Sequence, residues 1–158
     1  MYSTDSVYQI DWQKLFDRGY RGIILDIDNT LVPHGAPADE KSKELIERLK
    51  RTGYKLFIVS NNHEQRAKSF ADAVYVPYSF DAGKPCKGKI IEAIEAMGLQ
   101  KKQVIAVGDQ IFTDMWGAKN AGIEFILTKP IDTSTDTAFI RVKRVFEIPF
   151  KLLQTERI

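Results

Sequence analysis

Apolar residues along this chain gather in five short runs that alternate with longer amphipathic segments. The runs are rich in Ile and Val and are bounded by Gly or Asp, a pattern typical of strands that are buried on both faces of a parallel sheet. Strands are therefore predicted at Arg21–Asp26, Lys55–Ser60, Ala73–Val76, Gln103–Gly108 and Ile123–Leu127.

The amphipathic segments carry Leu, Ile or Ala at helical spacing, and Gly53, Gly98 and Gly122 stand where C-terminal caps belong. The alternation of strand and helix predicts an α/β fold with a doubly wound, Rossmann-like parallel sheet, for which we expect the strand order 3-2-1-4-5. Ligands of such folds bind beyond the carboxyl ends of the strands. The helices are predicted at Asp39–Arg51, Glu64–Ala71, Gly88–Met97 and Thr113–Asn120.

Length and composition limit the class of protein. The 158 residues suffice for one domain with its own core, so we expect a single domain over residues 1–158 with its core at about 21–128. One cysteine excludes a disulfide framework, and the sequence shows neither a signal-peptide pattern nor an apolar run of about 20 residues, so we expect a cytoplasmic protein. The net charge of +2 says little about partners.

Acidic residues follow the first and the fourth predicted strand. Asp26 and Asp28 alternate along an extended segment, so their side chains point the same way, and a neighbouring strand adds Asp109 and Asp114. Each one alone could be a helix N-cap or a turn former. Together, such carboxylates would repel one another unless their pKa values rise or a cation lies among them, and Mg²⁺ best suits a set of oxygen ligands. The sequence therefore predicts a Mg²⁺ site at this edge of the sheet.

The loop before the third predicted helix, DAGKPCKGKI, nearly matches two phosphate-binding patterns. A nucleotide-binding G-x-x-x-x-G-K loop would need Ser or Thr in place of Ile90, and Pro85 removes a backbone N–H that such a loop would donate to phosphate. A Cys-x5-Arg phosphatase loop would start at Cys86, but Glu92 stands where its arginine would be. What is left is Lys84, a cation whose role depends on the groups that the fold brings near it.

Four short motifs between Gly22 and about Leu127 resemble those of the haloacid dehalogenase superfamily of phosphotransferases in order and in spacing. The match is specific because it needs four separate motifs in one order. The corresponding residues are Asp26, Asp28 and Thr30 for D-x-D-x-T, Ser60 for the Ser or Thr after the second strand, Lys84 for a lysine often followed by proline, and Gly108, Asp109 and Asp114 for G-D-x-x-x-x-D.

The resemblance implies hydrolysis of phosphomonoesters through a covalent intermediate. Asp26 would attack phosphorus, while Asp28 would protonate the leaving oxygen and then activate water. In the transporting ATPases of this superfamily a Thr stands at the position of Asp28, so an Asp there favours a phosphatase. The resemblance also implies that Mg²⁺ is bound by Asp26, the backbone carbonyl of Asp28, Asp109 and Asp114, and that the phosphoryl group is bound by Thr30, Ser60, Asn61 and Lys84.

Members of the superfamily that act on small metabolites usually carry a cap domain, but Leu31–Ala38 and Ser79–Gly83 leave room only for loops. We therefore expect no cap domain, and an open site suited to a phosphate on a large partner such as a lipid headgroup at a membrane, unless neighbouring subunits supply a lid. Within this capless subclass III, the segments RGIILDIDNTLVP, IVSNN and VGDQIFTD resemble the YqeG-like branch, which is linked to phosphatidylglycerophosphate phosphatases.

Two other functions stay open. One is a soluble sugar-phosphate or nucleic-acid 3′-phosphatase of the same capless kind, and the other is a non-catalytic module that binds phosphate or a partner. A mere binder would not need the acid–base residue Asp28, which argues against the second. His34 departs from the YqeG-like pattern, which usually has Trp there, and is either a bystander or a substrate contact. We expect no nucleic-acid partner, and the sequence does not indicate an oligomeric state.

The last segment, 137–158, is predicted to be an amphipathic helical tail with a basic character. It has two interpretations. We favour a helix that covers the sheet, because helices with such a pattern usually face a core. The alternative is a basic element that rests on an anionic bilayer, which would make the protein peripheral at the inner face of the membrane. The basic residues are Arg141, Lys143, Arg144, Lys151 and Arg157.

Overall fold

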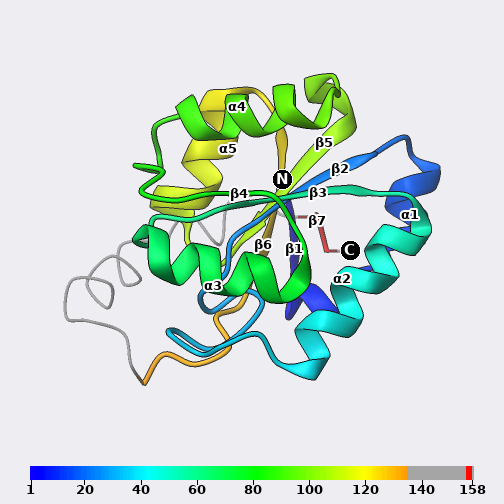
Figure 1. The fold of residues 1–158 in the computed structure, drawn as a ribbon. Coiled ribbons are helices and arrows are strands. Elements are labelled where there is room, and N and C mark those ends of the chain that lie inside the picture. Colours follow the sequence, from blue (N-terminus) through cyan, green and yellow to red (C-terminus); the bar gives the residue numbers. More distant parts are fainter. Residues whose placement is uncertain (135–155, 158) are drawn as a thin grey trace.

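The computed structural model describes residues 1–134 and 156–157 (Figure 1). Within these ranges, seven strands form one sheet in the order β4-β3-β2-β5-β6-β1-β7, and every neighbouring pair is parallel. The strands are β1 (Tyr2–Thr4), β2 (Gly22–Leu25), β3 (Lys55–Val59), β4 (Tyr78–Ser79), β5 (Val104–Gly108), β6 (Glu124–Thr128) and β7 (Glu156–Arg157).

Helices cover both faces of this sheet, with α2 and α3 on one side and α4 and α5 on the other (Figure 1). Successive side chains of a strand point to opposite faces, so Ile23 and Leu25 pack in the core beneath α1, α2 and α3, whereas Ile24 packs with α4 and α5. The helices are α1 (Trp12–Asp17), α2 (Glu40–Thr52), α3 (Glu64–Val74), α4 (Gly88–Met97) and α5 (Trp116–Ala121), with shorter helical turns η1 (Val7–Gln9), η2 (Lys101–Gln103) and η3 (Ile111–Met115).

The structure confirms the doubly wound parallel sheet, and its central order β4-β3-β2-β5-β6 is the predicted order 3-2-1-4-5. The third strand was misplaced, however. Val74 ends helix α3 and is buried in the core, Tyr75 caps that helix with a left-handed φ of 52°, and the strand begins only at Tyr78, beyond Pro77. An apolar run of four residues does not distinguish the buried end of a helix from a strand.

The fourth predicted helix also differs, because its first turn is the π-helix η3, which starts at Ile111 and precedes α5. Strand β1 pairs with β6 and was not predicted, since three residues carry too little apolar pattern to be recognised. Strand β7 falls at the end of the predicted helical tail, and residues 135–155 of the chain lie outside the described residues. None of the helices in the described residues combines the length and apolarity that crossing a membrane requires.

The pairing of β2 fixes which loops meet at the carboxyl edge of the sheet. Leu25 lies opposite Val107 of β5 on one side and opposite Ile58 of β3 on the other. The residues that follow these strands, Asp26, Asp109 and Ser60, therefore leave the sheet side by side, as the rule for ligand sites in doubly wound folds requires.

Candidate active site

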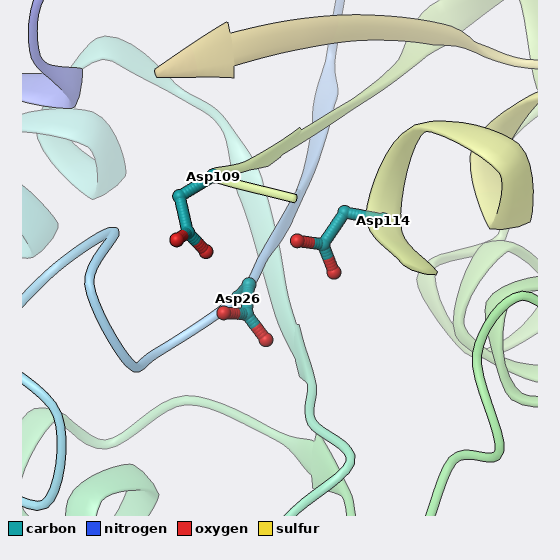
Figure 2. A group of neighbouring side chains, drawn as sticks. All are labelled: Asp26, Asp109 and Asp114. Atoms are coloured by element: carbon teal, nitrogen blue, oxygen red, sulfur yellow. The ribbon is translucent and has the colours of Figure 1, made fainter. Parts of the chain in front are cut away.

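Three aspartates converge at this edge (Figure 2). Asp26 follows β2, Asp109 follows β5, and Asp114 lies in η3. One carboxylate oxygen from each lies within 4.8 Å of the others, which makes them the group of acidic residues in the described part of the chain that could hold a metal ion. The predicted metal ligands Asp26, Asp109 and Asp114 are thus brought together, whereas the side chain of Asp28 lies outside this group.

Asp114 reaches the sheet because of the local backbone. The π-helix η3 folds it back toward the end of β5, where the Gln110 N–H donates to Asp114 Oδ2 at 3.1 Å. A Cβ at Gly108 would lie only 2.5 Å from the Asp114 carboxyl carbon. Glycine at this position is therefore a steric requirement of the site, which explains the Gly in the G-D-x-x-x-x-D motif.

Lys84 is the cation among these carboxylates. Its Nζ lies 2.7 Å from Asp26 Oδ1 and 2.6 Å from Asp114 Oδ1, and its side chain is 5% exposed. Burial alone would lower the pKa of Lys84, but the charges and hydrogen bonds of Asp114 and Asp26 raise it above its ordinary value. Lys84 therefore stays protonated at physiological pH.

The charges around Asp26 do not balance, because the single ammonium group of Lys84 faces the three carboxylates of Asp26, Asp109 and Asp114. Burial, together with repulsion from Asp114 and Asp109, raises the pKa of Asp26 to about 8, although the charge and hydrogen bond of Lys84 oppose this rise. A nucleophilic carboxylate must be ionised, so this site needs more positive charge than Lys84 supplies. A hard divalent cation such as Mg²⁺ fits the oxygen donors of Asp26, Asp109 and Asp114 and would restore the balance.

The loop that carries Lys84 is fixed by Asn61, the second residue after β3. The Lys84 N–H donates to Asn61 Oδ1 at 2.8 Å, and Asn61 Nδ2 donates to the Lys84 carbonyl at 3.3 Å. The side chain of Asn61 thus pairs with the backbone of Lys84 as a neighbouring strand would. The sequence suggested a phosphate contact for Asn61, and the structure adds this positioning contact, which the motif alone does not reveal.

Asp28 lies in quite different surroundings. Its Oδ1 accepts hydrogen bonds from the Gly35 N–H at 2.9 Å and from Arg66 at 2.8 Å, and its Oδ2 accepts one from Asn62 Nδ2 at 2.6 Å. Burial favours a raised pKa, but the hydrogen bonds of Arg66, Gly35 and Asn62 and the charge of Arg66 hold the pKa of Asp28 below its ordinary value. Neither Arg66 nor Asn62 was predicted as a site residue: Asn62 ends the segment IVSNN, whereas Arg66 lies outside every motif.

Asn62 also joins Asp28 to Ser60. Its Nδ2 donates to Ser60 Oγ at 2.8 Å and its backbone N–H to the same oxygen at 3.1 Å. A hydroxyl that accepts two hydrogen bonds still has its own proton to donate. Ser60 is therefore suited to donate to a phosphoryl oxygen, which is the role predicted for it.

Most of these side chains border a cavity of about 210 Å³ at the carboxyl edge of the sheet, but Asp109 and Arg66 are not among its lining residues. Thr30 is not among its lining residues; it is 1% exposed, and its role as a phosphate contact stays a prediction. His34 does line the cavity and is 42% exposed, so a substrate can reach it. The lining residues are Asp26, Asp28, His34, Ser60, Asn61, Asn62, Lys84, Gln110, Thr113 and Asp114.

A larger cavity, of about 770 Å³, lies at the amino end of β5 and β6. Its lining includes Lys101, Lys102 and Lys119, which are exposed, and none of the motif residues. Size therefore does not identify the functional site in this fold. The smaller cavity is the better candidate because buried, mutually paired ionisable groups meet there.

Comparison with known proteins agrees with this geometry. Residues 35–128 match the family model of haloacid dehalogenase-like hydrolases, a range that holds Ser60, Lys84, Asp109 and Asp114. The chain is 36% identical over 143 residues to "Probable phosphatase YqeG" of Bacillus subtilis, a match that covers 90% of this chain and 83% of that protein. The chain belongs to the haloacid dehalogenase-like hydrolases and is a phosphatase of that superfamily.

Two further similarities are more distant. The chain is 26% identical to phosphatidylglycerophosphate phosphatase 1, chloroplastic/mitochondrial, of Arabidopsis thaliana; the match covers 92% of this chain and 45% of that protein. The crystal structure of an uncharacterized protein from Listeria monocytogenes serotype 4b aligns with a TM-score of 0.55 at 18% identity, over 78% of this chain and 99% of that one. The second similarity supports the fold alone.

Proposed function

We propose that this protein hydrolyses phosphomonoesters through an aspartyl-phosphate on Asp26, in a Mg²⁺-dependent reaction, and that its substrate is phosphatidylglycerophosphate. The observation that carries the reaction is that Asp26, Asp114 and Lys84 line the same cavity as the separately bound Asp28, with Asp109 close enough to Asp26 and Asp114 to share a metal ion. The aspartates with Lys84 suit a nucleophile that is assisted by a cation, and Asp28 suits a residue that gives and takes a proton.

The chemistry follows from the positions of the side chains. The Asp26 carboxylate attacks phosphorus while the bond to the leaving oxygen breaks, and Lys84 offsets the charge that builds up between the carboxylate and the phosphoryl group. Asp28 protonates the leaving oxygen, then takes a proton from the water that attacks the aspartyl-phosphate. Ser60 donates a hydrogen bond from its hydroxyl to a phosphoryl oxygen. Phosphate leaves, and Asp26 is restored.

Mg²⁺ would be held by Asp26, Asp109 and Asp114, with the backbone carbonyl of Asp28 as a further predicted ligand. When bound, it supplies positive charge that offsets the phosphoryl oxygens and the nucleophile together. Lys84 already pairs with Asp26 and Asp114, so the protein's own contribution is to hold these carboxylates close together and to offset part of their charge.

The proposal of a large substrate rests on the connections around the site. Between β2 and α2, residues 26–39 contain an isolated bridge between Asp28 and Val32 and no helix, and residues 80–87 link β4 to α4 as a loop. Neither connection is long enough for a cap domain, so we propose an open site. An open site suits a phosphate that stands out from a bilayer, because the lipid surface then shields the reaction from water in place of a cap.

The lipid itself is proposed from the similarity to the Arabidopsis protein, which is named for phosphatidylglycerophosphate. A panel of substrates tests it: phosphatidylglycerophosphate in vesicles, glycerol 3-phosphate, a sugar phosphate and an oligonucleotide with a 3′-phosphate, each with Mg²⁺ and with chelator. We expect kcat/KM to be highest for the lipid. A higher value for a soluble phosphate would replace the lipid as substrate, and no turnover of any phosphomonoester would point to a binding module instead.

A variant separates delivery to the membrane from chemistry. Replacing Arg141, Lys143 and Arg144 by Gln removes three basic residues of the tail, each worth about 1 kcal/mol near an anionic surface. We expect weaker binding to anionic vesicles and slower hydrolysis of the lipid, with p-nitrophenyl phosphate hydrolysed at the wild-type rate. Equal loss on both substrates would assign the tail a structural role instead.

A further inference from the structure

The two oxygens of Asp28 are not equivalent. A carboxylate oxygen has two lone pairs, and both on Oδ1 are used, one by the Gly35 N–H at 2.9 Å and one by Arg66 at 2.8 Å. Within the described part of the chain, Oδ2 accepts one hydrogen bond, from Asn62 at 2.6 Å, and His34 Nδ1 is 3.6 Å away. A proton can therefore be exchanged at Oδ2 without breaking the contacts of Oδ1.

Both donors to Oδ1 are built into the fold. Gly35 has a left-handed φ of 76°, a backbone conformation that glycine adopts without cost, and this turn aims its N–H at Asp28. Arg66 lies in the first turn of α3, its side chain is only 20% exposed, and its guanidinium stands 5.8 Å from the ring centroid of Phe70, which is fully buried. Packing in the core thus fixes the direction from which Arg66 approaches.

Arg66 contacts the site through Asp28. The residues that line the 210 Å³ cavity, all in the described part of the chain, include Asp28 and Asn62 but not Arg66. Helix α3 begins directly after the loop of Ser60 and Asn62, so one segment supplies the contacts to both oxygens of Asp28.

We infer that Arg66 is a positioning residue: with the Gly35 amide it occupies Oδ1 of Asp28, so that Oδ2 is the atom that gives and takes the proton. This inference rests on the proposed function, in which Asp28 is the acid and base. In the first step the proton of Oδ2 moves to the leaving oxygen as its bond to phosphorus breaks and the bond to Asp26 forms. In the second step Oδ2 accepts a proton from water as the new phosphorus–oxygen bond replaces the bond to Asp26.

The test uses the leaving group. Protonation matters for an alkyl phosphate, whose leaving alkoxide is strongly basic, and matters little for 2,4-dinitrophenyl phosphate. The parameter kcat/KM reports the steps up to release of the leaving group, so later hydrolysis of the intermediate does not mask the difference. We expect Arg66→Gln to lower kcat/KM for an alkyl phosphate by about 10- to 100-fold, because a misplaced catalytic group costs rate on that scale. The fall for dinitrophenyl phosphate should be at least about ten times smaller.

Controls separate positioning from folding. Lys68→Gln breaks an exposed ion pair with Asp72 on the same helix and should leave both substrates unaffected. Arg66→Lys keeps the charge without the planar donor fork and should restore part of the alkyl phosphate activity. When Asp28 is already replaced by Asn, Arg66→Gln should change kcat/KM by the same factor for both substrates. Circular dichroism and thermal unfolding check that each variant is folded.

Three results would overturn the inference while leaving the proposed function intact. Equal losses on both substrates in a folded Arg66→Gln variant would mean that Arg66 binds the phosphoryl group or supports the structure. No loss on either would mean that Asp28 is oriented without it. If Arg66→Gln still lowers kcat/KM more for the alkyl phosphate than for dinitrophenyl phosphate in the Asp28→Asn background, Arg66 acts through another group. Failure of the proposed function is distinct, since the wild-type protein would then hydrolyse neither substrate.

Discussion

Asp26 and Asp28 are two residues apart, yet their carboxylates lie in opposite surroundings. Asp26 shares Lys84 with Asp114, and its pKa is raised by burial and by repulsion from Asp114 and Asp109. Asp28 is surrounded by the donors of Arg66, Gly35 and Asn62, and its pKa is lowered although burial opposes this. The extended segment between them sends the two carboxylates to different sets of neighbours at the same cavity.

The site thus has two halves, one around Asp26 and one around Asp28, and only the first needs an added positive charge. The half around Asp26 has too much negative charge to hold an ionised nucleophile, so it is completed by a cation. The half around Asp28 is electrically satisfied on its own, and the phosphoryl group that a substrate brings adds negative charge that opposes the lowering of its pKa. The following predictions break one half and leave the other in place.

The largest effect is expected from Asp26→Asn. An amide is a far weaker nucleophile and a weaker metal ligand, so turnover should fall by about 10⁴-fold or more while the protein stays folded. Steady-state hydrolysis of p-nitrophenyl phosphate with Mg²⁺ measures this. Activity within tenfold of wild type would remove Asp26 from the role of nucleophile.

Lys84→Ala removes the cation that the structure places between Asp26 and Asp114. We expect kcat/KM to fall by about 10²- to 10⁴-fold, as at other sites that lose a charge-stabilising donor. Lys87→Ala is the matched control on the same loop, because Lys87 is exposed, and it should stay close to wild type. A mild Lys84→Ala beside a damaging Lys87→Ala would show that the assignment of the lysine is wrong.

A smaller effect is expected from Asn61→Ala, which removes both hydrogen bonds to the backbone of Lys84. Misplacing the lysine should lower kcat/KM by about 10- to 100-fold. Asn120 offers the control, since its Nδ2 donates to the Pro85 carbonyl on the same loop at 3.0 Å without touching Lys84. If Asn120→Ala is as damaging as Asn61→Ala, the effect comes from the loop as a whole and not from Lys84.

The smallest expected effect is on the stability of the metal-free protein. The pKa of Asp26 is raised from 3.8 to about 8, so the folded state holds this proton more tightly than the unfolded state, and stability falls as pH rises between these values. Asp26→Asn removes this titration. Thermal unfolding in chelator at about pH 5 and pH 8 should therefore show a smaller loss of Tm for the variant than for wild type, with a difference of about 5 to 15 degrees.

Mg²⁺ extends this test, because at the higher pH it should raise the Tm of wild type more than that of Asp26→Asn. If Tm changes with pH by the same amount in the two proteins, both with and without Mg²⁺, the site does not carry an excess of negative charge.

The sequence predicted the Asp26 half of the site better than the Asp28 half. Asp26 and Asp109 could be found because each follows a recognisable strand and parallel strands bring their carboxyl ends to one edge, and Asp114 because it completes the G-D-x-x-x-x-D motif after β5. Arg66 could not be found in this way. It lies 38 positions along the chain from Asp28, on a helix whose pattern shows an ordinary polar residue, and its contact depends on the turn at Gly35 and on packing against Phe70.

The prediction of the strands was limited in the same way, by contacts between segments that are distant in the sequence. The apolar runs that form β2, β3, β5 and β6 are predicted correctly, because burial on both faces leaves a strong pattern. Strands β1 and β4, of three and two residues, are defined by pairing with a neighbour more than by their own sequence, so one was missed and the other was misplaced.

The most direct test of the two-carboxylate account is to trap the intermediate. In Asp28→Asn the attack by Asp26 on a phosphate with a good leaving group needs no acid, whereas hydrolysis of the aspartyl-phosphate lacks its base. Rapid quench of this variant with 2,4-dinitrophenyl phosphate and Mg²⁺, followed by mass spectrometry of its peptides, should find one phosphoryl group on Asp26, lost on standing at alkaline pH. Phosphorylation of a different residue, or none at all under conditions in which the leaving group is released, would contradict the account.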